Sequence, residues 1–463
     1  MRSSSSRATS EHTDVSELRE FRATADCENS WREEASVGST KPEHNLTTIS
    51  RPLSVPEHAQ LAVLQFLNDS IGALPFPHHE LSPRQWKQFV RWLDYSGLAL
   101  YFFDRYEQQQ WRDSLPDWVT ERLQLGLTDN AARTRSQVRE SAAIQQQFQE
   151  LGVRYAVIKG ISLWPHSVPD PELRSQLDLD FLVAEASASA ARSILERRGY
   201  RLYALSENCW EFKRNEQLGI TVKDLYKDLR SWAVELHIEP EAAGNYVGLN
   251  RLEWRELYGM RMPTLSSVDT FLWQGLHVHK NVCAEFLRTA HIWEFQNHVR
   301  CRRHDTHFWN AVHNATLNNQ NISMRLGIVL LLITEVLGEF APNSLTEWTV
   351  SLVPAEARTW IKRYGHRSVL GKFPGNKRYL LLQRALVDTG ISARRPLWET
   401  LLPTRLPPQI IRPLPNESAS TRITRNWMQV KFIAHRLRFH LIAGFDYWWE
   451  SRPWRRATRK FMR

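Results

Sequence analysis

Two aspartates stand two residues apart in a short apolar stretch, Leu-Asp-Leu-Asp-Phe-Leu-Val. If this stretch is a β-strand, Asp178 and Asp180 share one face, about 6.6 Å apart at a rise of ~3.3 Å per residue. Carboxylates that share a face repel each other unless water or a cation neutralises them. Hard divalent cations such as Mg²⁺ suit this arrangement. Taken alone, such a pair is more often a solvated strand face.

A third acid, Glu235, stands in a similar stretch, Ala-Val-Glu-Leu-His-Ile-Glu. Its neighbours Val234 and Leu236 face the opposite way. Three carboxylates on adjacent strands can hold two metal ions, which stabilise the attacking and leaving oxygens of a phosphoryl transfer. His237 shares the strand face of Glu235. It either orients that acid, contacts a substrate, or is a hydrogen-bonded, half-buried histidine.

A phosphate-binding turn is expected upstream of the two aspartates. The strand-like run Tyr-Ala-Val-Ile-Lys-Gly ends at Gly160, and a short helix containing Ser162 follows. Glycine lets the backbone approach a phosphate, and a helix N-terminus offers free N–H groups to it. Lys159 adds a cationic contact to a triphosphate. The ordered set of strand, glycine turn, helix, aspartate strand, helix and acid-bearing strand is a stronger signal than any one member.

These motifs resemble the uncharacterised nucleotidyltransferase family of the DNA polymerase beta-like superfamily. That family has a strand ending in Lys-Gly, a Pro-Asp-Pro segment followed by Arg, Asp-x-Asp on a strand, a helix closing with Gly-Tyr, and a later acid followed by Leu-His. The matching residues are Lys159, Gly160, Pro169, Asp170, Pro171, Arg174, Asp178, Asp180, Gly199, Tyr200, Glu235, Leu236 and His237. The resemblance covers roughly residues 85–299.

The resemblance implies a metal set and a phosphate set. The acids bind Mg²⁺ or Mn²⁺ and are catalytic, and the nucleotide phosphates lie against Lys159, Gly160, Ser162 and Arg174. For Arg174, a solvated loop arginine is an equal alternative. The wider superfamily has Gly-Gly or Gly-Ser at the turn, whereas this chain has Gly160 followed by isoleucine, with the serine one place later.

The expected function is that of a metal-dependent nucleotidyltransferase. It transfers a nucleoside monophosphate from a nucleoside triphosphate to an acceptor, which is a small molecule, a protein or a nucleic acid. Catalysis comes mainly from positioning and charge neutralisation. Two alternatives stay open. One is a catalytically inactive nucleotide-binding or regulatory module with the same fold, which the Gly-Ile turn favours; the other is a basic protein that binds an anionic surface.

The elements around these motifs predict an α+β fold, in which a small mixed β-sheet nucleotidyltransferase core is flanked by N-terminal and C-terminal helical regions. Residues 1–56 are polar and poor in aliphatic side chains, so we expect them to be disordered. We expect a helical region at 57–151, the core at 152–262, a helical domain at 263–368, an irregular Pro/Arg-rich segment at 369–420, and a C-terminal helix with a basic tail at 421–463.

Local signals predict several helix ends. Ser82 before Pro83 is a helix start, and Gly199 is a helix stop. The last helix, from Arg422 to about Glu450, has apolar residues at helical spacing. This spacing predicts a face packed into the core, made of Trp427, Val430, Ile433, Leu437 and Leu441.

Composition restricts the class of protein. The 463 residues are long enough for two or three domains, and 42% hydrophobic residues argue against a disordered, collagen-like or polytopic membrane chain. The formal net charge of +10 is compatible with nucleotide, nucleic-acid or anionic-surface partners. The apolar run from Leu326 to Gly338 falls short of the ~20 residues of a membrane span, so it predicts a core helix and no transmembrane segment. Four scattered cysteines indicate a reducing compartment, so a cytoplasmic setting is expected.

The C-terminal tail is basic and aromatic. No acid follows Glu450, and tryptophans interleave with the cations Arg452, Arg455, Arg456, Arg459, Lys460 and Arg463. Such a cluster can contact an anionic surface, either a membrane or a nucleic-acid backbone. Terminal charge runs are more often simply solvated.

Overall fold

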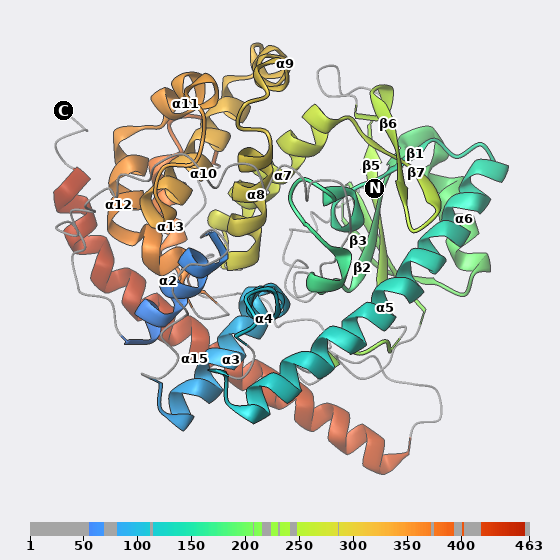
Figure 1. Cartoon of the computed structure of the whole chain (residues 1–463), viewed down its shortest axis with the longest axis horizontal. Helices are drawn as coiled ribbons and strands as arrows, with labels where there is room; N and C mark the ends of the chain where they lie inside the picture. The colour runs from blue at the N-terminus through green and yellow to red at the C-terminus, as the bar shows by residue number, and fades with distance from the viewer. Residues whose placement is uncertain are drawn as a thin grey trace, which may run out of the picture. The chain divides into compact units, whose positions relative to one another are not determined.

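A computed structural model of the chain describes residues 55–68, 81–111, 114–206, 208–214, 224–229, 232–240, 248–285, 287–371, 375–392, 401 and 418–458. These residues form two compact units (Figure 1). Unit 1 comprises the described residues between 122 and 270, and unit 2 comprises those before 122 and after 270. The expected disorder of residues 1–56 lies outside the described residues, apart from Val55 and Pro56, which begin a helix.

Unit 1 is built on a mixed sheet, to which the described residues contribute seven strands. They are β1 (Tyr155–Val157), β2 (Asp178–Ala184), β3 (Arg201–Ser206), β4 (Cys209–Lys213), β5 (Ala233–Glu239), β6 (Leu252–Leu257) and β7 (Met260–Leu265). Their order is β3-β4-β5-β2-β1-β7-β6. The pairs β2–β5 and β1–β7 are parallel, and the other neighbours are antiparallel. The predicted α+β class with a mixed sheet is confirmed.

The helices of unit 1 are α5 (Asp117–Glu150), which begins in unit 2, and α6 (Ala188–Arg197). Short 3₁₀ turns lie between the strands: η5 (Gly160–Leu163), η6 (Pro171–Leu173), η7 (Glu185–Ser187) and η9 (Gly248–Asn250). The predicted stop of α6 at Gly199 is confirmed. Gly199 has a left-handed φ of 84°, and its N–H donates to the carbonyl of Glu196 at 3.0 Å.

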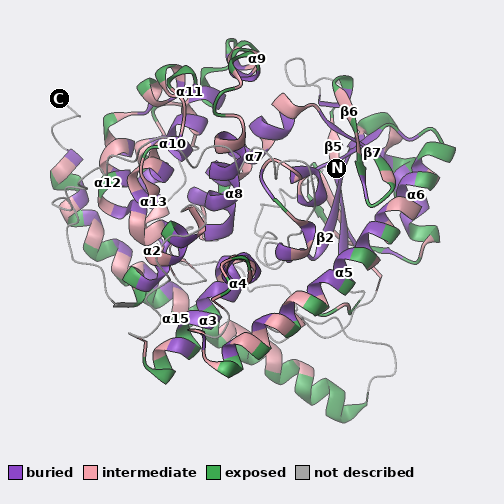
Figure 2. Cartoon of the chain, viewed as in Figure 1, coloured by how far each residue is buried: buried purple, intermediate pink, exposed green. Residues whose placement is uncertain are grey.

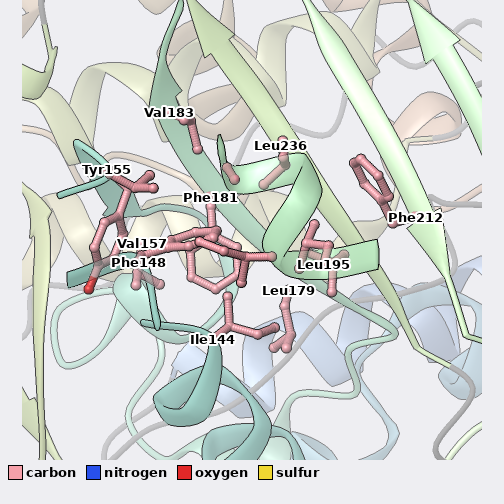
Figure 3. Close-up of a cluster of buried hydrophobic side chains, with 14 of the residues drawn as sticks. Ile144, Phe148, Tyr155, Val157, Leu179, Phe181, Val183, Leu195, Phe212 and Leu236 are labelled. Atoms are coloured by element: carbon pink, nitrogen blue, oxygen red, sulfur yellow. The ribbon is translucent and has the colours of Figure 1, made fainter. Parts of the chain in front are cut away.

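The apolar core of unit 1 lies on one face of the sheet, under α5 and α6 (Figure 3). Leu179, Phe181 and Val183 of β2 point into it, on the face opposite to that of Asp178 and Asp180. The ring of Phe148 in α5 packs edge-on against Phe181, with centroids 5.4 Å apart. This packing determines which face of β2 is buried against helices, and the aspartates take the other face.

The described residues of unit 2 form helices and the segments that connect them, with no strand among them. Its helices are α2 (Val55–Asn68), α3 (Pro83–Ser96), α4 (Ala99–Gln108), α7 (Ser267–Val282), α8 (Thr289–Cys301), α9 (Thr306–Thr316), α10 (Gln320–Leu337), α11 (Asn343–Thr349), η10 (Val350–Leu352), α12 (Ala355–Val369), α13 (Tyr379–Ala385) and α15 (Ala419–Thr458). α3 starts as predicted at Ser82, whose backbone N–H donates to Gln85 Oε1 at 2.9 Å.

α10 contains the apolar run that predicted a core helix. Among the described helices it alone is long and apolar enough to cross a membrane, yet 50% of it is buried within the protein. It packs against α9, α11, η10 and α12. Burial among these helices accounts for its apolar composition, since a central helix of a bundle is hydrophobic on most sides.

The C-terminal part departs from expectation in two respects. The segment expected to be irregular includes α13, which forms because Leu380, Leu381 and Leu382 are buried. The last helix, α15, continues past Glu450 and through Pro453 to Thr458. The predicted core-packing face is wrong: Trp427, Val430, Leu437 and Leu441 are more than half exposed (Figure 2 shows α15 largely exposed toward its N-terminal end).

Candidate active site

β2 and β5 carry the three predicted acids. The two strands pair in parallel, with Asp180 opposite Glu235 and Asp178 opposite Ala233. Asp178 precedes Asp180 by two residues and therefore lies on the same face of β2. All three acids are buried. Buried carboxylates require cationic or hydrogen-bonding partners, because their desolvation is otherwise unfavourable.

Lys159 is the cationic partner of these acids. Its ammonium lies 2.8 Å from Asp180 Oδ1 and 3.5 Å from Glu235 Oε2. The backbone of Lys159 has a φ of 52°, a left-handed conformation that costs a lysine energy and persists where surrounding structure requires it. Sequence reasoning placed this side chain against a triphosphate. In the structure the turn after β1 directs it to the two carboxylates.

The electrostatics of this cluster favour charged acids beside a charged lysine. Burial alone would lower the pKa of Lys159, but Asp180, Glu235 and Asp178 raise it well above its ordinary value. Burial alone would raise the pKa of Glu235, but Lys159 and a hydrogen bond from His237 hold it well below its ordinary value. At neutral pH Glu235 is therefore a carboxylate and Lys159 is a cation beside it.

His237 contacts both acids. Its Nε2 lies 2.9 Å from Asp180 Oδ1, 3.2 Å from Glu235 Oε2 and 3.2 Å from the Lys159 ammonium. Burial and Lys159 would lower its pKa, but Cys209 and the hydrogen bond to Asp180 raise it well above its ordinary value. Of the roles left open by the sequence, the geometry supports that of a residue that orients the acids.

Cys209 is a site residue that sequence reasoning missed. β4 and β5 pair so that Cys209 lies opposite His237, and its Sγ is 3.9 Å from Glu235 Oε2. The ligand atoms of Cys209, Glu235 and His237 all lie within 4.8 Å of one another. Thiolate, imidazole and carboxylate together suit Zn²⁺. No sequence signal identified Cys209, because the register of β4 against β5 is not written in the residues around it.

The glycine turn is packed closely against the start of β2. Gly160 has a φ of 38°, and a Cβ at this position would lie 2.1 Å from Gln176 Oε1. The amide of Gln176 in turn donates to the carbonyl of Asp178. Ser162 donates its hydroxyl to the carbonyl of Lys159 at 2.8 Å, which closes the turn. The phosphate contacts expected of Gly160 and Ser162 stay predictions.

Two arginines lie near this turn. Arg255 of β6, which sequence reasoning missed, donates to the carbonyls of Ser162 at 2.9 Å and Trp164 at 2.8 Å. It thereby holds η5 in place. Arg174 is only 4% exposed, so the alternative of a solvated loop arginine is wrong. Asn130 donates a hydrogen bond to the backbone carbonyl of Arg174 at 3.5 Å. The contact expected between Arg174 and a phosphate stays a prediction.

The donor set of the acids fits a divalent cation. Carboxylate oxygens are the ligands that Mg²⁺ and Mn²⁺ prefer. The ammonium of Lys159 shows where these carboxylates stabilise a positive charge. A divalent cation held by Asp180 and Glu235 would compete with this ammonium for their carboxylates. Binding of the cation therefore requires the Lys159 side chain, which is 22% exposed, to move away.

Comparison with known proteins supports the family resemblance. A family described as uncharacterised nucleotidyltransferase matches residues 82–338. No curated protein matches the chain. Among solved structures, the chain is similar to an antigenic nucleotidyltransferase-like protein from Paracoccidioides brasiliensis at 12% identity, covering 44% of this chain and 94% of that one. The TM-score of this match is 0.26, so it carries no argument.

Proposed function

Because the chain belongs to the uncharacterised nucleotidyltransferase family, we propose that it transfers a nucleoside monophosphate from a nucleoside triphosphate to an acceptor. The observation that carries this proposal is the parallel register of β2 and β5, which sets Asp180 opposite Glu235. Asp178, on the same face, also contributes to the charge that acts on Lys159. Acids gathered on one sheet face beside a cation position suit metal-assisted phosphoryl transfer.

We assign distinct roles to the residues of this site. Asp178, Asp180 and Glu235 hold Mg²⁺ or Mn²⁺, which when bound neutralises charge on the reacting phosphate oxygens. His237 keeps the carboxylates of Asp180 and Glu235 oriented. Once displaced from the acids, the Lys159 ammonium is available to the triphosphate.

The backbone around the glycine turn supplies the remaining contacts. The backbone at Gly160 is assigned to the phosphates, Gln176 packs against this turn where a Cβ of residue 160 would lie, and Arg255 holds η5 in place by its two carbonyl contacts. We assign Arg174 to steady the start of β2 or to meet a phosphate, since a guanidinium offers two parallel donors. Rate acceleration then comes from positioning and charge neutralisation.

The test is Mg²⁺-dependent binding of ATP, CTP, GTP and UTP by the full chain, followed by pyrophosphate release. Asp178→Asn removes one acid without breaking the ion pair between Lys159 and Asp180, and we expect it to abolish Mg²⁺-dependent nucleotide binding. Glu140→Gln is the matched control, because Glu140 is a similarly buried acid on α5 that pairs with Arg198 and Arg214 and not with Lys159. Retention of Mg²⁺-nucleotide binding by Asp178→Asn refutes the assignment of the acids.

A second candidate function is supported by the position of Lys159. Its ammonium already neutralises Asp180 and Glu235, as it would in a nucleotide-binding or regulatory module that has lost metal chemistry. This candidate predicts nucleotide binding that is independent of Mg²⁺, with no pyrophosphate released over a broad panel of small-molecule, protein and nucleic-acid acceptors. Mg²⁺-dependent release with any acceptor excludes it.

A further inference from the structure

The long helix α15 meets the rest of unit 2 through one face of its C-terminal half. Its buried residues His440, Ala443, Tyr447, Ser451, Trp454 and Thr458 recur at steps of three and four. At 100° per residue they lie on one side of the helix. Tyr447 accepts a hydrogen bond from Arg384 at 3.0 Å, which ties this side to α13.

A second side of α15, centred roughly 120° around the helix from the buried one, presents large apolar side chains to solvent. Six of them, each between 46% and 63% exposed, form what we call the apolar stripe: Trp427, Val430, Leu437, Leu441, Phe445 and Trp448. At 100° per residue they fall within an arc of roughly 80°, over about 32 Å of helix. Ile442 and Trp449, which are 59% and 60% exposed, widen this face on one side. A face this wide indicates burial against something other than unit 2.

The exposed side of α15 is also strongly basic. Five exposed cations lie within about 80° of the centre of the stripe; they are Lys431, Arg438, Arg452, Arg455 and Arg456. Arg452 lies 3.9 Å from the centre of the Trp448 ring, and Lys431 lies 5.1 Å from that of Trp427. These cations therefore border the aromatic rings of the stripe.

The acidic residues of α15 lie away from the apolar stripe and contact other helices of unit 2. Within residues 418–458 they are Asp446 and Glu450. Asp446 pairs with Arg378 at 2.9 Å, and Glu450 accepts a hydrogen bond from Tyr364 at 3.0 Å. Both are thus committed to contacts within unit 2. The outward side of the helix is left with cations and apolar groups, and its described residues include no anion.

We propose that the apolar stripe docks on an anionic lipid bilayer, with α15 lying in the plane of the interface. Helices that lie in this way combine Trp, Phe and Leu on one side with Lys and Arg beside them. The aliphatic residues enter the boundary of the acyl chains, the tryptophan rings lie at headgroup depth, and the cations pair with lipid phosphates and carboxylates. The cytoplasmic setting expected from the sequence would offer such a surface, since that leaflet carries anionic lipids.

Charge distinguishes a bilayer from the other occupants. A second copy of α15 would bring two basic, acid-free borders together, and like charges repel. A nucleic acid would satisfy the cations, but its phosphates would leave Val430, Leu437 and Leu441 exposed to water. An anionic bilayer satisfies both kinds of group at once.

The experiment is sedimentation of the full chain with vesicles of phosphatidylcholine, alone or mixed with phosphatidylserine. We expect binding to the mixed vesicles that weakens as salt is added, and binding to phosphatidylcholine alone that is at least about tenfold weaker. Arg438→Gln should weaken binding to the mixed vesicles about fivefold. The double variant Leu441→Gln/Phe445→Gln should weaken it roughly tenfold or more, because two large apolar groups no longer enter the bilayer.

Leu317→Gln is the matched control. Leu317 and Leu441 are both 58% exposed, but Leu317 follows α9 and is not part of the stripe. The control should bind the mixed vesicles as the parent does, and all variants should keep the parent's midpoint of thermal unfolding because the replaced groups are exposed.

Three results overturn the proposal. The first is absence of binding to mixed vesicles, or equal binding by the parent and the double variant. The second is a dimer in light scattering that the double variant dissolves, which assigns the stripe to a second copy. The third is retention of RNA or DNA that the double variant abolishes while vesicle binding is absent, which assigns the surface to nucleic acid.

Discussion

Replacing Lys159 by methionine removes the internal cation of the site while keeping a side chain of similar length. In the parent, the ammonium lies 2.8 Å from Asp180 and 3.5 Å from Glu235, whose side chains are 2% and 10% exposed. Removing one partner of a buried ion pair leaves the other charge uncompensated, at a cost of about 3–5 kcal/mol. Because the Lys159 side chain is itself 22% exposed, we expect the lower end of this range, about 3 kcal/mol.

The stability that Lys159→Met loses relative to the parent should depend on pH. The pKa of Glu235 is held below its ordinary value of 4.5 in the folded chain, so the stability it contributes is present above pH 4.5 and is lost at lower pH. The pKa of Lys159 is raised above 10.5, so its contribution is present below pH 10.5 and is lost at higher pH. The stability difference between parent and Lys159→Met is therefore full between these limits and shrinks outside them.

Metal binding should change in the opposite direction. In the parent, a divalent cation must displace the ammonium from the carboxylates, whereas in Lys159→Met it meets no competing charge. We therefore expect Mg²⁺ to bind the variant more tightly than the parent and to restore much of the lost stability by mass action. The measurements are thermal unfolding at pH 7 with and without Mg²⁺, and titration calorimetry with Mg²⁺. About 3 kcal/mol corresponds to roughly 6–12 °C for a unit of this size.

Arg198→Met is the matched control. Arg198 pairs with Glu140 of α5 at 2.9 Å, and the two side chains are 16% and 11% exposed, similar to those of the site. This control should be destabilised without any gain in Mg²⁺ affinity. If Lys159→Met is as stable as the parent at pH 7, or gains no affinity for Mg²⁺ beyond that of Arg198→Met, the inference that Lys159 holds the cation position is refuted.

Two further outcomes follow from buried positions in unit 2. Burial, with help from Arg325, lowers the pKa of His279 to about 3, so only the unfolded chain binds its proton below pH 6.5. The free energy of unfolding should then fall between pH 7 and pH 5, with His279 contributing about 2 kcal/mol of that fall. Urea unfolding of His279→Gln should show a shallower fall over the same pH range. A pH dependence equal to that of the parent contradicts this. A Cβ on Gly327 would lie 2.3 Å from the carbonyl oxygen of Thr349, so Gly327→Ala should lower the free energy of unfolding by about 1–3 kcal/mol. Gly444→Ala in α15 meets nothing within 4 Å and should not destabilise the chain; equal effects of the two alanines would refute the packing argument.

The sequence was informative where a local period or a turn signal decides the structure. Alternation in β2 put Asp178 and Asp180 on one face, and Leu179 and Phe181 lie in the core on the other. Ser82 and Gly199 marked helix ends because capping depends on residues within one turn. The same logic failed for α15. Helical spacing shows that apolar residues share a face, but it does not show whether another part of the chain covers that face.

What the sequence by itself determined was the type of chemistry: three acids, a glycine turn and a lysine in the order typical of one family. The tertiary structure decided how they meet. Pairing of β2 with β5 set Asp180 against Glu235, the backbone after β1 directed Lys159 to both of them, and pairing of β4 with β5 added Cys209. Strand partners and register depend on how residues far apart in the chain pack together. The packing of α5 and α6 against one face of the sheet is an example. Side-chain periodicity along a single strand carries no record of that packing.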